Sequence, residues 1–184
     1  LEGKVAGISY VDDSQSVICS VTSEYDERSN MSELEYIVSG VSFSQGYQYN
    51  TQGTLFSEDT VTPYTMGGVT YTYDNFDRIT TKVIEQNSIG VTSGFKNTIS
   101  YTYKTVNNAT SPYVSYYTST VENSSGATST STYSYLYDSK GYIIRITKGS
   151  DVIKYEYDMY GQLAYEKRGI YEYTYTYDNA GNTV

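Results

Sequence analysis

The sequence predicts an all-β protein in which antiparallel β-hairpins form a curved or spiralling sheet. Three observations predict it. Tyrosines alternate with mostly polar residues near the C-terminus, Tyr-Asp pairs recur at a fixed step, and a glycine follows each of these aspartates. Side chains of a strand alternate between its two faces, so this pattern gives one aromatic face and one wet face. We expect the aromatic face, built from many of the 25 tyrosines, to lie against a core.

The clearest repeat has a step of twenty residues and the pattern Tyr-Asp-x-x-Gly. Its pairs begin at Tyr137, Tyr157 and Tyr177, and its glycines are Gly141, Gly161 and Gly181. An aspartate that opens a type I turn accepts hydrogen bonds from amides ahead of it, and the glycine takes a left-handed conformation. Such a turn, with its bulge, joins the strands of a hairpin. Strands are therefore expected at residues 142–148 and 162–168, with one hairpin per repeat.

Weaker copies of the pattern precede this region, at steps of 24 to 34 residues. Asn50 stands in place of aspartate in one copy. Asp77 and Asn107 stand in place of glycine in two others, and Asp26 marks the faintest copy. Asparagine and aspartate tolerate the left-handed conformation better than most residues. The degenerate copies are therefore expected to form hairpins as well, for a total of about fourteen to sixteen short strands, two per copy.

The step is longest between Tyr73 and Tyr137, so insertions are expected there. Polar stretches predict long loops at residues 107–112 and 122–130, with a third at residues 84–94. Pro112 lacks an amide hydrogen and would avoid a hydrogen-bonded ladder position.

Two N-terminal segments need a choice of secondary structure. Residues 30–40 fit a helix with a capping box at its start, but their alternation favours a strand. Residues 8–11 and 16–22, on either side of Asp12 and Asp13, predict a further hairpin. Cys19 lies in the second of these runs and is expected to be a small buried strand residue, not a reactive thiol.

Composition excludes several classes of function. The net charge of −9 lacks the basic footprint that nucleic acids and anionic membrane surfaces require. No stretch is long and apolar enough for a transmembrane span, and no signal peptide is visible. The chain begins without Met and stops just after a turn, which suggests a segment excised from a longer protein.

The residues for common catalytic sites are missing. The sequence has no histidine, which excludes a His-based triad, base or metal ligand, and it has no phosphate-binding loop. The repeated aspartates are explained by turn geometry. Asp12 with Asp13, and Asp74 with Asp77, could coordinate calcium, but neither pair supplies the number of ligands that such a site needs. We therefore assign no catalytic, cofactor-binding or metal-binding residue and expect no enzyme activity and no cofactor.

Tyr-x-Tyr-Asp-x-x-Gly followed by an aliphatic residue resembles the YD repeat of Rhs proteins, insecticidal toxin-complex shells and teneurins. The resemblance is strongest over residues 133–184. It implies hairpins wound into a spiral sheet that forms a hollow shell, of which residues 1–184 would be one partial YD-repeat domain. Residues 1–45 would be degenerate repeats or a cap, residues 46–132 irregular repeats with long loops, and residues 133–184 regular repeats.

The resemblance also gives an expected role. It implies a structural segment of a large secreted or surface-displayed bacterial protein, which serves as scaffold or shell. Its partners would be neighbouring repeats of the parent chain and an encapsulated cargo domain. The alternative is an extracellular binding module for cell-wall or host glycans or a surface protein, because YD repeats have been linked with carbohydrate binding. Nothing in the sequence matches the self-cleaving segment that commonly ends Rhs cores, so that activity is not implied.

Overall fold

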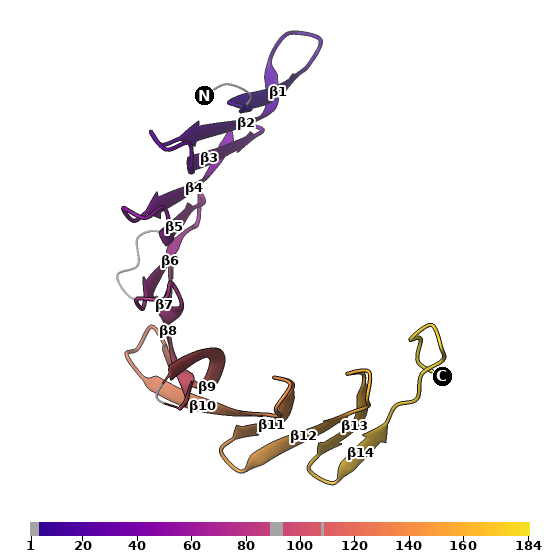
Figure 1. Cartoon of the computed structure of the whole chain (residues 1–184). Helices are drawn as coiled ribbons and strands as arrows, with labels where there is room; N and C mark the ends of the chain where they lie inside the picture. Colours follow the sequence, from indigo (N-terminus) through magenta and orange to yellow (C-terminus); the bar gives the residue numbers. More distant parts are fainter. Residues whose placement is uncertain (1–3, 89–93, 108) are drawn as a thin grey trace. The chain divides into compact units, whose positions relative to one another are not determined.

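The protein is all-β. The computed structural model describes residues 4–88, 94–107 and 109–184, and these contain fourteen strands of one open antiparallel sheet. The strands follow one another in the sheet in chain order (Figure 1). Their bounds are β1 Gly7–Val11, β2 Val17–Tyr25, β3 Met31–Val38, β4 Val41–Tyr49, β5 Leu55–Val61, β6 Thr65–Tyr73, β7 Ile79–Ser88, β8 Phe95–Val106, β9 Ala109–Glu122, β10 Thr128–Tyr137, β11 Ile143–Lys148, β12 Asp151–Tyr157, β13 Leu163–Arg168 and β14 Tyr171–Thr174. The predicted fold class, a sheet of antiparallel hairpins, is confirmed.

One type of turn closes eight hairpins of the described chain. In each, an Asp or Asn carbonyl accepts the amide of the residue three positions later, and that residue has a positive φ. The first and fourth residues are Asp12 and Gln15, Asp26 and Ser29, Asn50 and Gly53, Asp74 and Asp77, Asn123 and Gly126, Asp138 and Gly141, Asp158 and Gly161, and Asp178 and Gly181. The predicted turn chemistry is therefore confirmed, including Asp77 at φ 57°.

The ladder is also bulged next to these turns, as predicted. The register shifts between Leu136 and Tyr137 in the β10–β11 pair and between Glu156 and Tyr157 in the β12–β13 pair. The pairs β2–β3, β4–β5 and β6–β7 shift at the corresponding tyrosine. A bulge adds twist and re-aims the side chains beside it.

The predicted long loops are wrong where the structure describes them. β9 already runs from Ala109, with Pro112 inside it. Residues 122–130 contain a short turn that begins at Asn123, followed by the start of β10. The turn is stabilised by Asn123 Oδ1, which accepts the amides of Ser125 and Ala127 at 3.0 and 3.1 Å. β7 extends to Ser88, and residues 89–93 of the third expected loop lie outside the described residues. Strand length, not loop length, accounts for much of the wider spacing in this region.

The choice of strand for residues 30–40 is confirmed, since β3 occupies most of that segment. The N-terminal hairpin is also confirmed: β1 and β2 pair around the Asp12 turn. Cys19 lies in β2 as expected, but it is half-buried instead of buried.

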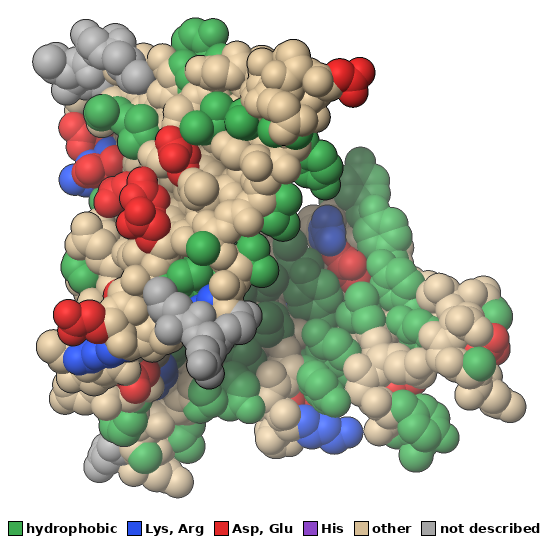
Figure 2. Space-filling model, turned by 90° about the horizontal axis from the view of Figure 1, so that it is seen from above, with side chains coloured by type: hydrophobic (Ala, Val, Ile, Leu, Met, Phe, Trp, Pro, Cys, Tyr) green, Lys and Arg blue, Asp and Glu red, His purple; other side chains and the backbone are tan. Residues whose placement is uncertain are grey.

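The expected core behind the tyrosine face is absent from the described residues, none of whose hydrophobic side chains is fully buried. The solvent-accessible area is 12647 Å², against about 8,900 Å² for a compact monomer of this mass. Hydrophobic side chains accordingly lie at the surface in Figure 2, among polar ones. The sheet is a single layer with solvent on both faces, because no second sheet or helix covers either face of its described strands.

The chain divides into two compact units, and they differ in charge. The N-terminal unit comprises residues 1–99 and 120–129, and the C-terminal unit residues 100–119 and 130–184. The first has fourteen acidic and five basic residues, a net charge of −9. The second has seven of each and is neutral. The net negative charge of the protein therefore comes from the N-terminal unit alone.

Candidate functional site

The tyrosine of the Tyr-Asp pattern connects successive hairpins. In β12, the Tyr157 hydroxyl donates to the Ile143 carbonyl of the preceding hairpin at 2.9 Å. Three equivalent bonds run from Tyr73 to the Leu55 carbonyl at 2.5 Å, from Tyr137 to Val114 at 2.8 Å and from Tyr177 to Leu163 at 2.8 Å. A half-buried hydroxyl needs a partner, and here that partner is a backbone group of the neighbouring repeat. The hydroxyl proton is thus engaged in a structural contact between repeats.

A second tyrosine packs on the glycine of the next turn. A Cβ added at Gly161 would lie 2.3 Å from the Tyr142 hydroxyl, and one at Gly141 would lie 2.3 Å from that of Tyr113. Tyr142 also packs on Tyr157 with ring centroids 4.9 Å apart. The glycine therefore supplies both the left-handed turn and the space for the ring.

Four tyrosines of β8, β9 and β10 form an aromatic cluster around Tyr117. Its ring stacks on that of Tyr133 at 4.8 Å and contacts Tyr135 at 6.1 Å and Tyr101 at 5.9 Å. Burial, and then the proximity of the Tyr117 hydroxyl, raise the pKa of Tyr135 to about 12. The cluster is the nearest equivalent of a core in the C-terminal unit, although all four rings remain partly exposed.

Glu166 is a buried carboxylate on the sheet, with 6% of its surface exposed. Its Oε1 pairs with Arg168, and its Oε2 accepts the Tyr175 hydroxyl at 3.3 Å. The ion pair raises the pKa of Arg168. A buried charge is tolerated when it is paired and hydrogen-bonded, so this group is explained by its contacts.

Two of the acidic residues considered for calcium, Asp12 and Asp74, hydrogen-bond to their own turns. Asp12 Oδ1 accepts the amides of Ser14 and Ser16 at 2.9 Å, and Asp74 binds two turn amides and the Arg78 guanidinium. Across the described residues, no three His, Cys, Asp or Glu side chains gather as metal ligands would. These aspartates are therefore accounted for by turn geometry.

Replacing Asp158 by alanine is expected to destabilise the protein by about 1 kcal/mol, as for a lost capping side chain. Its Oδ1 accepts the amides of Tyr160 and Gln162 at 2.8 and 2.9 Å, and alanine would leave both without that partner. Asn50 and Asn123 make the same pair of bonds in their turns, so Asp158→Asn should be nearly neutral. Urea unfolding of both variants checks this. Equal losses would mean that the carboxylate charge, not the acceptor, matters.

Stability is expected to fall when the pH drops below about 3.8. The pKa values of four turn aspartates are lowered from 3.8, chiefly by side-chain bonds: Asp12 with Ser14, Asp26 with Asn30, Asp74 with Arg78 and Asp178 with Asn182. The unfolded chain then binds more protons than the folded one. The stabilisation is therefore present above the unfolded pKa and is lost as pH falls through the folded values. Thermal melts at pH 5, 4 and 3 measure it. A variant with all four changed to asparagine should lose much less between pH 5 and 3, and an unchanged slope would contradict the assignment.

Comparisons with known proteins add no identity: no family model matches the chain, and none of the curated proteins compared with it matches its sequence. None of the described residues forms a helix long and apolar enough to cross a membrane.

Proposed function

We propose that this chain is a non-enzymatic structural segment, a stretch of YD-repeat sheet that serves as scaffold or shell in a large secreted or surface-displayed bacterial protein. The observation that carries the proposal is the bond from the tyrosine hydroxyl of one hairpin to a backbone carbonyl of the preceding hairpin, made by Tyr73, Tyr137, Tyr157 and Tyr177. It uses the most characteristic residue of the repeat to hold neighbouring repeats together, as a scaffold requires.

The exposed single layer also supports this role. A sheet without a core has two faces available, one for the interior of a larger assembly and one for its surroundings. The partners would be further repeats of the parent chain and a cargo domain held on one face. The resemblance of residues 133–184 to YD repeats supplies the bacterial, extracellular setting of the proposal.

Alanine variants at Tyr133, Tyr155 and Tyr173 test whether the tyrosine face is structural. These residues share one face of β10, β12 and β14, since Tyr155 and Tyr173 both pair with Glu166. We expect each variant to lose stability in thermal melts, and the parent chain to show no tyrosine-dependent retention on peptidoglycan or a neutral glycan array.

The alternative function, a glycan-binding module, predicts the opposite pattern. Tyr171 and Tyr173 are 63% and 47% exposed, enough for a sugar ring to reach them. A glycan retained by the parent chain, and released in a tyrosine variant whose circular dichroism is unchanged, would establish a binding face and overturn the scaffold proposal.

A further inference from the structure

The first four strands of the N-terminal unit carry an apolar face. Two rows of directly paired side chains cross β1–β4 on this face: Ile8, Val21, Tyr36 and Phe43 form the first row, and Tyr10, Cys19, Val38 and Val41 form the second. Directly paired residues share a face of a sheet, and so do residues two apart in a strand, so the two rows lie side by side. Neither row contains a charged side chain.

The opposite face of the same strands is polar. Its rows are Gly7, Thr22, Glu35 and Ser44, and Ser9, Ser20, Ile37 and Ser42. Beside them, Glu24 lies directly opposite Glu33 in the β2–β3 pair. This division is typical of an antiparallel sheet that has one face covered and the other in water.

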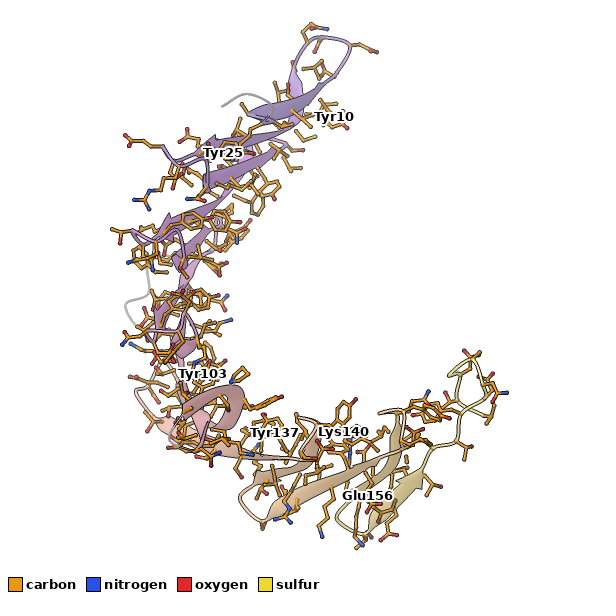
Figure 3. All side chains as sticks on the ribbon, in the orientation of Figure 1. Tyr10, Tyr25, Tyr103, Tyr137, Lys140 and Glu156 are labelled. Atoms are coloured by element: carbon orange, nitrogen blue, oxygen red, sulfur yellow. The ribbon has the colours of Figure 1, made fainter. Side chains whose placement is uncertain are left out.

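No such cover is present over the apolar face of β1–β4. Six of its eight side chains, all except Cys19 and Val21, are 37% to 67% exposed within the described part of the chain. Figure 3 labels Tyr10 on β1, where side chains extend from both sides of the layer. The face is therefore built for a contact that the described residues of this chain do not make.

The apolar face of β1–β4 is large enough for a specific interface. From the exposed fractions, and about 150–250 Å² for an aromatic side chain and somewhat less for an aliphatic one, the eight side chains present roughly 600 Å². That is the upper limit of the apolar patch of a typical monomer, about 300–600 Å². Two such faces in contact would bury about 1,200 Å² in total, which is within the range of specific protein interfaces.

Charge decides which partner fits. The N-terminal unit has a net charge of −9, so two copies repel one another over most of its surface. The two rows of the apolar face are the exception, because they bring no charge to the contact. A cationic partner would instead be attracted to the opposite face, where Glu24, Glu33 and Glu35 lie.

We propose that two copies of this chain form a face-to-face dimer through the apolar face of β1–β4. Sheets that pack face to face keep their strands aligned within about 30° and lie about 10 Å apart. A two-fold axis parallel to the strands, between β2 and β3, gives this arrangement and makes the contact isologous. It places β1 of one copy on β4 of the other, and β2 on β3. This contact goes beyond the scaffold role proposed above.

The two rows are self-complementary about that axis. Each row then faces its own counterpart, and the facing pairs are Tyr10 with Val41, Val21 with Tyr36, Ile8 with Phe43 and Cys19 with Val38. Every aromatic ring meets an aliphatic side chain, so neither copy places ring on ring. The acidic turn at Asp12 and Asp13 lies at the same end of the strands as the uncharged turn of residues 39–40, and the axis brings these two turns together.

The first test measures the oligomeric state of the full chain by sedimentation velocity over a range of protein concentrations. The variant Val38→Glu places a carboxylate in the centre of the apolar face, at a side chain that is 51% exposed. The matched control is Ile18→Glu. Ile18 is 49% exposed and lies on the opposite face of β2, so both variants change one exposed aliphatic residue and add the same charge.

The second measurement uses Cys19 as a probe of the face. It is the one cysteine of the sequence, it is half-buried, and it lies in the second apolar row. A dimer through this face covers it, whereas a dimer through any other surface leaves its thiol as reactive as in the monomer. The rate of alkylation by a maleimide is therefore measured at low and at high protein concentration.

We expect the parent chain to dimerise with a dissociation constant in the micromolar range, and added salt to tighten the dimer by screening the repulsion between copies. Alkylation of Cys19 should slow as the dimer forms. Val38→Glu should weaken the dimer at least about a hundredfold, because the change enters an isologous contact twice, and Ile18→Glu by less than about threefold. If circular dichroism shows that Val38→Glu does not fold, Tyr10→Glu takes its place, at a side chain 67% exposed.

Four results would each overturn the proposal. They are a parent chain that stays monomeric at about 100 µM, equal weakening by Val38→Glu and Ile18→Glu, a dimer whose Cys19 reacts as fast as that of the monomer, and a monomer whose Cys19 is already protected. The last result would mean that another segment of the same chain covers the face. The outcome is separate from that of the scaffold test, because Tyr133, Tyr155 and Tyr173 belong to the C-terminal unit.

Discussion

Replacing Tyr117 by alanine is expected to lower the free energy of unfolding by about 2–4 kcal/mol, somewhat below the cost of removing a fully buried aromatic ring. The ring contacts Tyr101, Tyr133 and Tyr135, and it joins the strands β8, β9 and β10 in a sheet where no hydrophobic side chain of the described residues is fully buried. Its removal leaves three rings without their common neighbour. Urea unfolding followed by circular dichroism measures the loss.

Two variants isolate the cause. Tyr117→Phe keeps the ring and should cost less than about 1 kcal/mol, because it removes one hydroxyl. Tyr116→Ala is the positional control: Tyr116 is the neighbouring residue, 44% exposed, and should tolerate alanine with a smaller loss. A Tyr116→Ala loss as large as that of Tyr117→Ala would show that the strand, and not the cluster, is sensitive.

Replacing Gly161 by alanine is expected to cost about 2–3 kcal/mol. The residue has φ +83°, where a Cβ is strained by roughly 1–2 kcal/mol. The new Cβ would also lie 2.3 Å from the Tyr142 hydroxyl and 2.9 Å from the ring carbon that carries it, so the ring must move away from Tyr157.

Gly149 provides the matched control for this prediction. It has φ +57° in the turn between β11 and β12, but a Cβ there would have nothing within 4 Å. Gly149→Ala should therefore show the backbone strain alone, about 1 kcal/mol. The difference in urea midpoint between the two variants reports the ring contact. Identical midpoints would mean that Tyr142 moves aside freely and does not hold the hairpins together.

Much of the fold could be predicted because its signals are local. The Asp138 and Asp158 turns depend on residues within four positions of one another, so the sequence alone identifies them. The Asn123 turn was missed, although Asn123-Ser-Ser-Gly126 carries the same signal, because no Tyr-Asp pair marks it. The length of β9 was also missed. A proline inside a polar stretch is typical of a loop, and the strand pairing that extends β9 depends on residues outside that stretch.

The exposure of the tyrosine face could not be predicted. Alternation shows that residues share a face, but it does not show whether anything covers that face. The hydroxyl of Tyr157 and the ring of Tyr142 find their partners in neighbouring repeats, and such partners depend on the pairing register. The alignment of three cations across β11–β13 is a similar case. Arg145, Lys154 and Lys167 are nine and thirteen residues apart, and only the register of β11–β13 aligns them.

The absence of a shared core among the described strands has a consequence for cooperativity. Each strand pairs only with the strands before and after it in the chain, so the closing loops are short and the free-energy cost of ordering a hairpin is met locally. Folding should then propagate from hairpin to hairpin and should not be one all-or-none event. Amide exchange should accordingly be fastest toward the ends of the sheet. For the same reason, inserting or deleting a hairpin would change the packing of its two neighbours and leave the more distant hairpins as they are. The number of hairpins is thus a quantity that mutation can change in steps of about twenty residues.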